Sequence, residues 1–373
     1  MEAKPRIAIV HEWLTSMRGG EKCVEAMCEL FPSADLYTLL HVEGSVSPVI
    51  ERMPIKTSFI QHLPFAGRVY RYYLPLFPAA IRQFSLEQYD VVISSHHCVA
   101  KGVRTGERTL HICYCHTPMR YIWDLFEEYF GTKNAGVFTR LGAHLFRGYL
   151  RRWDVRTGEN PNYFLANSRH VQKKILSLYR READVIYPPV DVQSFRISTR
   201  DDGYFLVAGA LVPYKRVDLA VEVFNDTGQR LIIAGDGPEA VRLKRRSRRN
   251  IEFVGWQTDE DLRSLYAGCR ALIFPGEEDF GIVPLEAMAS GKPVVAYAKG
   301  GALETVVDGV TGVLFPGQSA DAMKRALGIF ERARFDAEVL RNRALKFDRG
   351  VFLARLTEYV DQRWRMFETT RAA

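Results

Sequence analysis

Short apolar runs alternate with amphipathic stretches along the whole chain. Residues 6–10, 89–95 and 204–209 are such runs, and each leads into a polar loop and then into helix-type spacing of apolar positions. Apolar runs of this length are typical of buried parallel strands, and their alternation with helices predicts βαβ units. Because 373 residues exceed one ordinary core and the rhythm restarts near residue 204, the pattern predicts two α/β domains.

One βαβ unit in the second half combines this pattern with polar chemistry. An apolar run at 271–274 is followed by a Pro-Gly break, an acidic cluster at 277–279, a helical pattern at 282–289 and a further strand from 292. Pro284 fits the first turn of that helix, where its missing N–H costs nothing. The acidic loop therefore lies at the carboxyl end of a predicted parallel strand, where open α/β sheets bind ligands.

The residue types in this unit suit a sugar nucleotide. The N–H groups around Gly281, Ile282 and Val283 lie at a helix N-terminus, which is a ready phosphate site, and Gly281 permits close backbone approach. The carboxylates of Glu278 and Glu286 can each accept two hydrogen bonds from a vicinal diol. A capped helix whose acidic residues stabilise its dipole would explain the same spacing.

The string from Glu278 to Gly281, with residues 285–288 and 291–295, resembles the E-x7-E signature of family 4 retaining glycosyltransferases of the GT-B fold group. Within that family the chain is most similar to the WbaZ-like mannosyltransferases, which build bacterial polysaccharides. The resemblance extends from about residue 7 to 364. It implies an α/β protein of two Rossmann-like domains, residues 1–187 for the acceptor and 188–347 for the donor, facing across a cleft. A C-terminal helix, 348–373, would cross back to the N-terminal domain.

The resemblance also implies roles for individual residues. Glu286 would hold the ribose diol, and Glu278 would hold the donor sugar hydroxyls beside the reacting carbon. Lys215 and Arg216 would stabilise charge on the departing diphosphate, and His116 would lie beside the donor sugar. The remaining implied donor contacts are Gly19, Gly20, Gly209, Gly255, Trp256, Phe280, Gly281, Ile282 and Val283.

Three details limit the alternatives. The family usually has an arginine at the position of Ala210, five residues before Lys215, so one phosphate contact is missing. Residues 235–240 read G-x-G-x-x-A, but no acidic residue ends a predicted strand about 20 positions later, and the family resemblance implies a similar loop here, which together argue against a dehydrogenase. Residues 259–261 mimic a metal-binding D-x-D, yet they follow Thr258 and open a helix, so helix capping is the better interpretation. We expect no metal and no cofactor; the nucleotide sugar is a substrate.

Composition supports a reduced, cytoplasmic globular protein. No apolar run reaches about 18 residues, the N-terminus leads directly into a strand without a signal peptide, and the six cysteines show no disulfide framework. Cys113 and Cys115 fall on one strand face, which favours packing over zinc binding. The net charge of +7 favours anionic partners such as nucleotide phosphates, lipid pyrophosphates or an anionic bilayer. The basic run at 244–249 lacks aromatic residues, so we predict a solvated helix end and no nucleic-acid binding.

Residues 59–84 interleave aromatic residues and arginines without any acid. Such a stretch can lie on a membrane interface, or it can form a helical hairpin packed within the domain. Pro75 and Pro78 would break any long helix, and the pattern leaves both interpretations open. We therefore expect a peripheral contact with the cytosolic face of a membrane as one possible partner.

The expected reaction is transfer of a hexose, with mannose from GDP-mannose as the first candidate, to a glycan or lipid-linked oligosaccharide acceptor with retention at the anomeric carbon. Two alternatives stay open. One is a phosphorylase or sugar-nucleotide synthase of the same fold, and the other is a non-catalytic nucleotide-sugar binding protein.

Overall fold

The computed structural model describes residues 5–123 and 137–372, and its contacts divide the chain into two compact units. Unit 1 comprises the chain up to Pro189 and again from Phe352 onward, and unit 2 comprises Val190–Val351.

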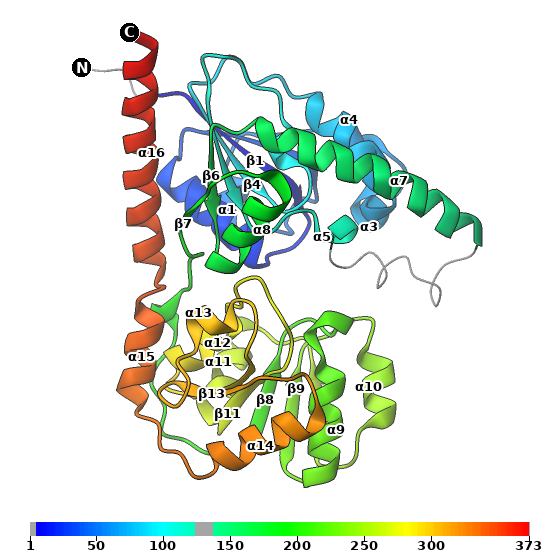
Figure 1. The fold of residues 1–373 in the computed structure, drawn as a ribbon, viewed down its shortest axis with the longest axis vertical. Helices are drawn as coiled ribbons and strands as arrows, with labels where there is room; N and C mark the ends of the chain where they lie inside the picture. Colours follow the sequence, from blue (N-terminus) through cyan, green and yellow to red (C-terminus); the bar gives the residue numbers. More distant parts are fainter. Residues whose placement is uncertain (1–4, 124–136, 373) are drawn as a thin grey trace. The chain divides into compact units, whose positions relative to one another are not determined.

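Unit 1 is built on a seven-stranded parallel sheet in the order β3-β2-β1-β4-β5-β6-β7 (Figure 1). The strands are β1 (Ile7–Leu14), β2 (Asp35–His41), β3 (Ile55–Thr57), β4 (Val91–His96), β5 (Leu110–Cys115), β6 (Tyr163–Ala166) and β7 (Asp184–Val185). Non-consecutive neighbours such as β1 and β4 show that the chain winds in both directions from the first strand, which is a doubly wound arrangement.

Helices cover both faces of this sheet (Figure 1). They are α1 (Gly19–Leu30), α2 (Pro48–Glu51), α3 (Ala66–Val69), α4 (Phe77–Arg82), α5 (Arg120–Trp123), α7 (Val137–Arg156), α8 (Arg169–Tyr179) and α16 (Arg349–Ala372), with short 3-10 helices η1 (Phe59–His62), η2 (Tyr70–Leu76), η3 (Ala100–Gly102) and η4 (Thr157–Glu159). Helices α1 and α16 pack on one face, and α4 and α7 pack on the other.

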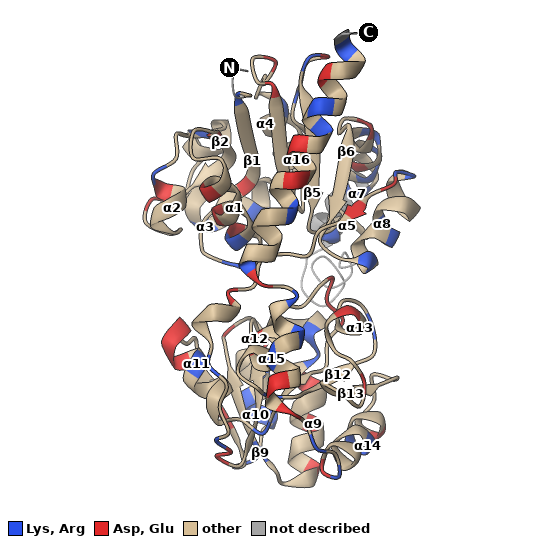
Figure 2. Cartoon of the chain, turned by 90° about the vertical axis from the view of Figure 1, so that its left-hand side faces the viewer, with Lys and Arg blue, Asp and Glu red and all other residues tan. Residues whose placement is uncertain are grey.

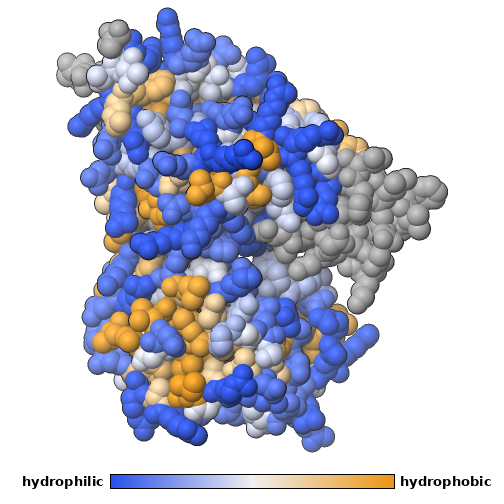
Figure 3. Space-filling model, in the orientation of Figure 1, coloured by the Kyte–Doolittle hydropathy of each residue, from blue (hydrophilic) through white to orange (hydrophobic). Residues whose placement is uncertain are grey.

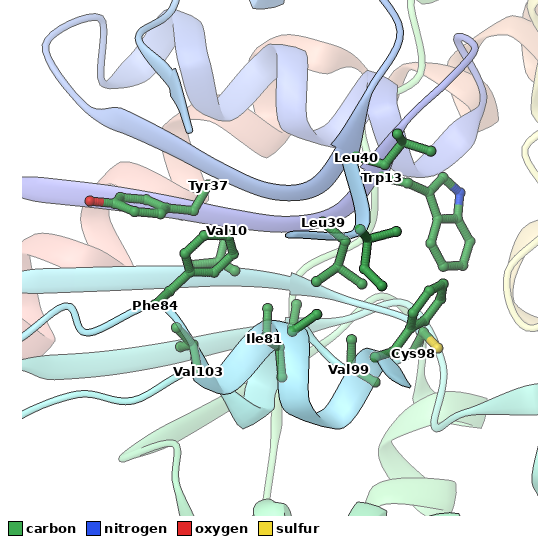
Figure 4. Packing of buried hydrophobic residues seen from close by; sticks show 14 of the residues in the cluster. Val10, Trp13, Tyr37, Leu39, Leu40, Ile81, Phe84, Cys98, Val99 and Val103 are labelled. Atoms are coloured by element: carbon green, nitrogen blue, oxygen red, sulfur yellow. The ribbon is translucent and has the colours of Figure 1, made fainter. Parts of the chain in front are cut away.

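Successive residues of a strand point to opposite faces of the sheet, so alternate residues pack into a hydrophobic core on each face. Val10 packs with Ile81 and Phe84 on the α4 side, and Figure 4 shows these side chains pointing toward one another. Ile9 packs on the opposite face with Phe352 and Leu356 of α16. The C-terminal helix thus belongs to the core of the first domain, as predicted.

The stretch from 59 to 84 has a buried half and an exposed half. Its prolines break it into short helices, since Pro75 lies inside η2 and Pro78 lies in the first turn of α4. Phe77 is buried against the sheet, whereas Phe65 and Tyr72 are 79% and 85% exposed. Packing within the domain therefore explains only part of this segment.

Unit 2 is a six-stranded parallel sheet in the order β10-β9-β8-β11-β12-β13. Its strands are β8 (Tyr204–Ala208), β9 (Arg230–Ala234), β10 (Ile251–Gly255), β11 (Ala271–Phe274), β12 (Val294–Tyr297) and β13 (Gly312–Phe315). Its helices are η5 (Val192–Ser194), η6 (Pro213–Lys215), α9 (Val217–Thr227), α10 (Ala240–Arg246), α11 (Asp259–Gly268), α12 (Val283–Ala289), α13 (Ala302–Thr305), α14 (Ala320–Phe330) and α15 (Ala337–Leu345). Two Rossmann-like sheets in one chain confirm the predicted fold class.

Several local predictions are confirmed at this level. The Thr258 hydroxyl accepts the Asp261 amide at 3.1 Å, so residues 259–261 form the acidic first turn of α11, seen in red in Figure 2. All six cysteines are free and buried. The basic run at 244–249 lies at the solvated end of α10.

The surface of unit 2 also carries an apolar area. Figure 3 shows hydrophobic atoms gathered on the side of unit 2 around α13. Leu303, Val307 and Val310 are exposed in and just after that helix. These residues lie outside the groups that the sequence singled out.

Candidate active site

The loop between β11 and α12 has the geometry of an anion site. Helix α12 begins at Val283, and its first backbone bonds are donated by Leu285 and Glu286 to the carbonyl of Ile282 at 2.9 and 3.2 Å. The amides of Gly281, Ile282 and Val283 therefore precede the helical ladder and lie at its positive end. Gly281 has a φ of 79°, and a Cβ there would lie 2.9 Å from the Phe274 ring. Any other residue would therefore be strained in this turn.

Lys215 and Glu278 meet at the carboxyl ends of two neighbouring strands. Lys215 follows β8 and Glu278 follows β11, and these strands pair in the sheet. The Lys215 Nζ lies 3.0 Å from the Glu278 Oε1, and the two side chains are 16% and 17% exposed. Both line one small cavity, so a cation and a carboxylate stand together where a ligand could reach them.

Two glycines make room for this lysine. A Cβ on Gly209, whose φ is 123°, would lie 2.8 Å from the Lys215 Nζ. A Cβ on Gly276 would lie 2.7 Å from the Lys215 Cα. Because Gly209 has no side chain, it leaves room for the Lys215 ammonium group in the predicted site.

Glu286 is held by a residue that the sequence analysis missed. Its Oε2 accepts a hydrogen bond from the Tyr266 hydroxyl at 2.8 Å. Burial and the neighbouring Glu286 carboxylate raise the pKa of Tyr266 well above its ordinary value, so the phenol stays a donor. Tyr266 lies in α11, twenty residues before its partner, and no spacing rule could have linked them.

The loop that carries Glu278 and Phe280 is fixed from behind by a glycine pair. The Gly301 amide donates to the Glu278 carbonyl at 2.8 Å. A Cβ on Gly300 would lie 2.3 Å from the Glu278 carbonyl oxygen, and one on Gly301 would lie 2.0 Å from that of Phe280. This close backbone approach sets the position of Glu278.

Arg216 makes contacts within unit 2. It adopts a left-handed conformation with a φ of 51° at the start of α9. Its guanidinium donates to the Asp218 carboxylate at 3.1 Å and to the Gln318 side chain at 3.0 Å. Its role toward phosphate stays a prediction.

Gly255 and Trp256 lie at the end of β10, on the same edge of the sheet. The Gly255 carbonyl accepts the Gly235 amide at 2.6 Å, and Trp256 is 75% exposed. A Cβ on Gly235 would lie 2.0 Å from the Gly209 carbonyl oxygen. Backbone crowding therefore accounts for the first glycine of the G-x-G-x-x-A string, while the base-reading role of Gly255 and Trp256 stays a prediction.

In unit 1, the structure brings the Gly19-Gly20 loop and His116 together. Gly19 and Gly20 open α1, after the loop that follows β1. A Cβ on Gly20 would lie 3.6 Å from the His11 ring and 4.0 Å from the His116 Nε2. His116 follows β5 and contacts the Ser95 Oγ through its Nε2 at 2.8 Å. Burial lowers the pKa of His116 to about 3, with help from His97 and His11, so the ring is neutral near pH 7.

A buried carboxylate beneath these residues was also missed. The Oε1 of Glu12 accepts four successive backbone amides, from residues 97 to 100, at 2.8 to 3.1 Å. Burial raises the pKa of Glu12, but His97 and His96 more than compensate and hold it well below its ordinary value. The amides come from the turn after β4, so only the folded chain reveals this compensation.

Three side chains here have the spacing of a metal site. Among the described residues, His11, Glu12 and His97 offer ligand atoms within 4.8 Å of one another. No metal was expected from the sequence, and no motif in it indicated this group. Four backbone amides donate to the Oε1 of Glu12 and compensate its charge, whereas the Glu12 Oε2 and the His11 Nε2 are buried without a hydrogen-bond partner in the part of the chain that the structure describes.

Comparison with known proteins places these two sites in a family. The profile described as "Glycosyltransferase Family 4" matches residues 18–194, and that described as "Glycosyl transferases group 1" matches residues 192–347. The matches meet at the boundary between the units and together run through both sites. The chain belongs to family 4 of the glycosyltransferases, with the GT-B fold.

Relatives within family 4 differ in their named activities. The chain is 28% identical over 213 residues to a D-inositol 3-phosphate glycosyltransferase of Mycobacterium avium, covering 50% of each chain. It is 26% identical over 192 residues to the O-antigen chain mannosyltransferase C of Escherichia coli, covering 48% of this chain and 51% of the relative. The matched part spans about half the length of these relatives.

Two solved structures show the same fold. HepE of Anabaena in complex with UDP-glucose superposes with a TM-score of 0.69 at 18% identity, covering 95% of this chain and 99% of the other. Sucrose-phosphate synthase of Thermosynechococcus elongatus gives a TM-score of 0.71 at 17% identity, covering 97% and 100%.

Proposed function

We propose that this family 4 protein is a retaining glycosyltransferase that moves a hexose from a nucleotide sugar to a glycan or lipid-linked acceptor. The observation that carries the proposal is the Lys215–Glu278 pair, 3.0 Å apart at the carboxyl ends of β8 and β11. The amides that begin α12 follow Glu278 in the same loop. A cation, helix amides and a carboxylate in one place suit a ligand with both phosphates and sugar hydroxyls.

The mechanism follows from where charge develops. When the bond between the sugar and the diphosphate breaks, negative charge grows on the leaving oxygens. The Lys215 ammonium and the amides of residues 281–283 stabilise that charge without reorganising. Glu278 accepts hydrogen bonds from the sugar hydroxyls and steadies the positive character of the anomeric carbon. Glu286, oriented by Tyr266, accepts from the ribose diol.

GDP-mannose is the first candidate donor, with support from the similarity to the O-antigen mannosyltransferase. UDP-glucose is the rival, since it is the ligand named for the Anabaena structure. Saturation-transfer NMR with a panel of sugar nucleotides separates the two. We expect GDP-mannose to give the strongest transfer to both the base and the sugar. A stronger signal from UDP-glucose, competed by UDP, would replace mannose with glucose.

Turnover separates the proposal from its alternatives. A transferase releases nucleoside diphosphate slowly from its donor alone, by hydrolysis, and faster when a glycan acceptor is added. A phosphorylase or synthase needs inorganic phosphate or a free nucleotide for turnover. A binding protein saturates with donor and never consumes it, and that result would end the enzymatic proposal.

We further propose that the enzyme binds an anionic membrane surface through residues 65–82 of unit 1. Phe65 and Tyr72 are exposed there, with Arg68, Arg71 and Arg82 exposed nearby. An anionic leaflet attracts each basic residue by about 1 kcal/mol, and aromatic rings favour the headgroup level. No helix within the described residues is long and apolar enough to cross a membrane, so the proposed contact is peripheral.

The basic helix α7, which lies later in unit 1, contributes less to this surface. Arg147 and Arg151 donate to the Ile122 carbonyl at 3.3 and 2.9 Å, and Arg151 stacks on Trp123. These two guanidinium groups are therefore engaged with the protein. The side chain of Arg140 lies outside the described residues.

Liposome flotation tests the membrane proposal. At low salt we expect binding to anionic vesicles and not to neutral ones, and a loss of binding when Arg68, Arg71 and Arg82 become Ser. A matched control replaces Arg245, Arg246 and Arg249, an exposed basic group without aromatic neighbours at the end of α10. An equal loss of vesicle binding in both triple variants would show that only the net charge of the protein matters. If the parent enzyme binds no vesicles, the membrane proposal fails and the enzyme acts on its acceptor from solution.

A further inference from the structure

Three side chains form a chain of hydrogen bonds across three adjacent strands of unit 1. His11 lies on β1, Ser95 on β4, and His116 just after β5. His11 is the direct neighbour of Ser95 in the parallel register. The His11 Nδ1 lies 3.0 Å from the Ser95 Oγ, and that oxygen lies 2.8 Å from the His116 Nε2. We call these three residues the relay.

The direction of each proton in the relay follows from hydrogen-bond chemistry. The His11 Nδ1 also lies 3.2 Å from the Ser95 carbonyl oxygen. A carbonyl oxygen only accepts, so the Nδ1 of His11 must carry a proton. The Ser95 oxygen then accepts a hydrogen bond from the His11 Nδ1. The Ser95 hydroxyl donates its own hydrogen to the His116 Nε2. That nitrogen is therefore an acceptor, and the proton of a neutral His116 must reside on Nδ1.

We infer that Ser95 and His11 are positioning residues that hold His116 as the neutral tautomer protonated on Nδ1. In this form His116 presents an N–H donor to an oxygen of the bound substrate and does not act as a base through Nε2. The inference rests on the proposed function, in which His116 touches the donor sugar. It adds which nitrogen makes the contact and which residues enforce that choice.

The charges around the relay support this direction. Carboxylate oxygens of Glu21 and Glu12 each lie 3.8 Å from a His11 ring nitrogen, and they raise the pKa of His11 although burial opposes them. A positively charged His11 is protonated on Nδ1 and cannot accept from Ser95. The rings of His97 and Tyr114 face His116, with distances between ring centroids of 6.3 Å and 5.1 Å. His97, His11 and His96 disfavour a second proton on His116, and only Glu12 opposes them.

The neighbouring strand positions provide a matched control. One residue earlier on β4, the Ser94 Oγ contacts the His111 Nε2 at 2.8 Å, which is the same distance as in the Ser95–His116 contact. Successive strand residues point to opposite faces, so this second pair lies on the other side of the sheet. Ser94→Ala removes an equivalent buried bond without touching the relay.

The test reads the ring nitrogens of His116 by 15N NMR on the full chain labelled at histidine, with His116→Asn to assign the signals. We expect the parent to show a neutral ring protonated on Nδ1 from pH 6 to 8. Ser95→Ala should move the proton to Nε2, while Ser95→Thr, which keeps the hydroxyl, and Ser94→Ala should leave it on Nδ1. His11→Asn keeps a donor near the position of Nδ1 and should also preserve the tautomer.

Activity provides the second readout. Losing one aligned hydrogen bond predicts a fall of roughly 2- to 12-fold in kcat/KM for Ser95→Ala, with rescue in Ser95→Thr. A parent ring protonated on Nε2, or one that titrates near pH 6.5, would overturn the inference even if Ser95→Ala failed to fold. If His116 shows the expected tautomer but no variant turns over the donor, the relay is supported and the proposed function is contradicted.

Discussion

The two candidate sites differ in the exposure of their charged side chains and in the groups that compensate them. In unit 2, Lys215 and Glu278 are partly exposed and face each other in a small cavity. In unit 1, Glu12 and His11 are fully buried, and backbone amides and neighbouring side chains compensate them internally. Groups of the first kind are suited to bind a charged ligand. Groups of the second kind are suited to fix the position of a neutral one, His116.

The distribution of histidine repeats this contrast. All nine histidines of the chain lie before residue 190, and residues 190–351 contain none. The two units should therefore respond differently to mild acid, and mutations in the two sites should have effects of different size.

Lys215→Ala should reduce kcat more than it raises the donor KM, because charge on the leaving phosphate grows only in the transition state. By analogy with removal of one oxyanion donor, we expect a loss of roughly 10²- to 10³-fold, measured by steady-state kinetics. Lys299→Ala is the matched control, because it breaks a second lysine–glutamate pair, with Glu277 at 3.0 Å. Near-parent turnover in a Lys215→Ala, Arg216→Ala double variant would disprove the phosphate role.

Glu286→Ala should raise the donor KM strongly and change kcat less. A ribose contact is made in the ground state and in the transition state alike, so its loss appears in binding. A hydrogen bond to a charged group predicts a rise of roughly 10- to 150-fold. Isothermal titration with the donor checks this value, and an unchanged affinity would contradict the assignment.

Mild acid should destabilise unit 1 and not unit 2. Burial lowers the pKa of His111 and His116 to about 3, below the ordinary value of 6.5. Between these values the unfolded chain binds protons that the folded chain does not. Stability is therefore full above pH 6.5 and falls as the pH drops, by up to about 1.4 kcal/mol per pH unit for each such histidine. The pKa of His11 is raised above 6.5 in the folded chain, so its contribution to stability changes only above pH 6.5 and does not affect this range.

Hydrogen exchange at pH 6.5 and 5.5, corrected for intrinsic rates, tests this difference. The amides of β4 and β5 should lose protection, while those of β8 and β11 should keep it. An equal loss in both sheets would mean that carboxylates, and not the buried histidines, govern the response.

Tyr266→Phe should have the smallest effect. It removes the hydroxyl that orients Glu286 and leaves the carboxylate in place, so we expect a rise in the donor KM of roughly 2- to 12-fold. Tyr204→Phe is the control, because the Tyr204 hydroxyl donates only to a backbone carbonyl, that of Leu265, at 2.7 Å. A larger effect on kcat than on KM would place Tyr266 in another role.

The fold was largely predictable because strand and helix periods are local properties of the sequence. Pro284 and Gly281 marked the start of α12 to within one residue, and the apolar runs located strands such as β1, β4, β8 and β11. The short strands β3 and β7 contain no apolar run and were not predicted. The unit 2 site was also visible, since Glu278, Gly281 and Glu286 lie within nine positions of one another.

The supporting contacts were not predictable, because they join distant parts of the chain. Tyr266 reaches Glu286 across two helices, and Ser95 joins His11 to His116 across three strands. The amides on Glu12 come from a turn about 85 residues away. In each case the partner has an ordinary residue type, and only the three-dimensional structure assigns it a role.

The most direct test of the central claim is the anomeric configuration of the product. Parent enzyme, GDP-mannose and a lipid-linked or glycan acceptor are incubated together, and the new linkage is read by proton and carbon NMR. The account predicts an α-linked hexose formed together with nucleoside diphosphate, which is retention of the donor configuration. A β-linked product, or donor consumption that requires inorganic phosphate or a free nucleotide and forms no glycan, would contradict it.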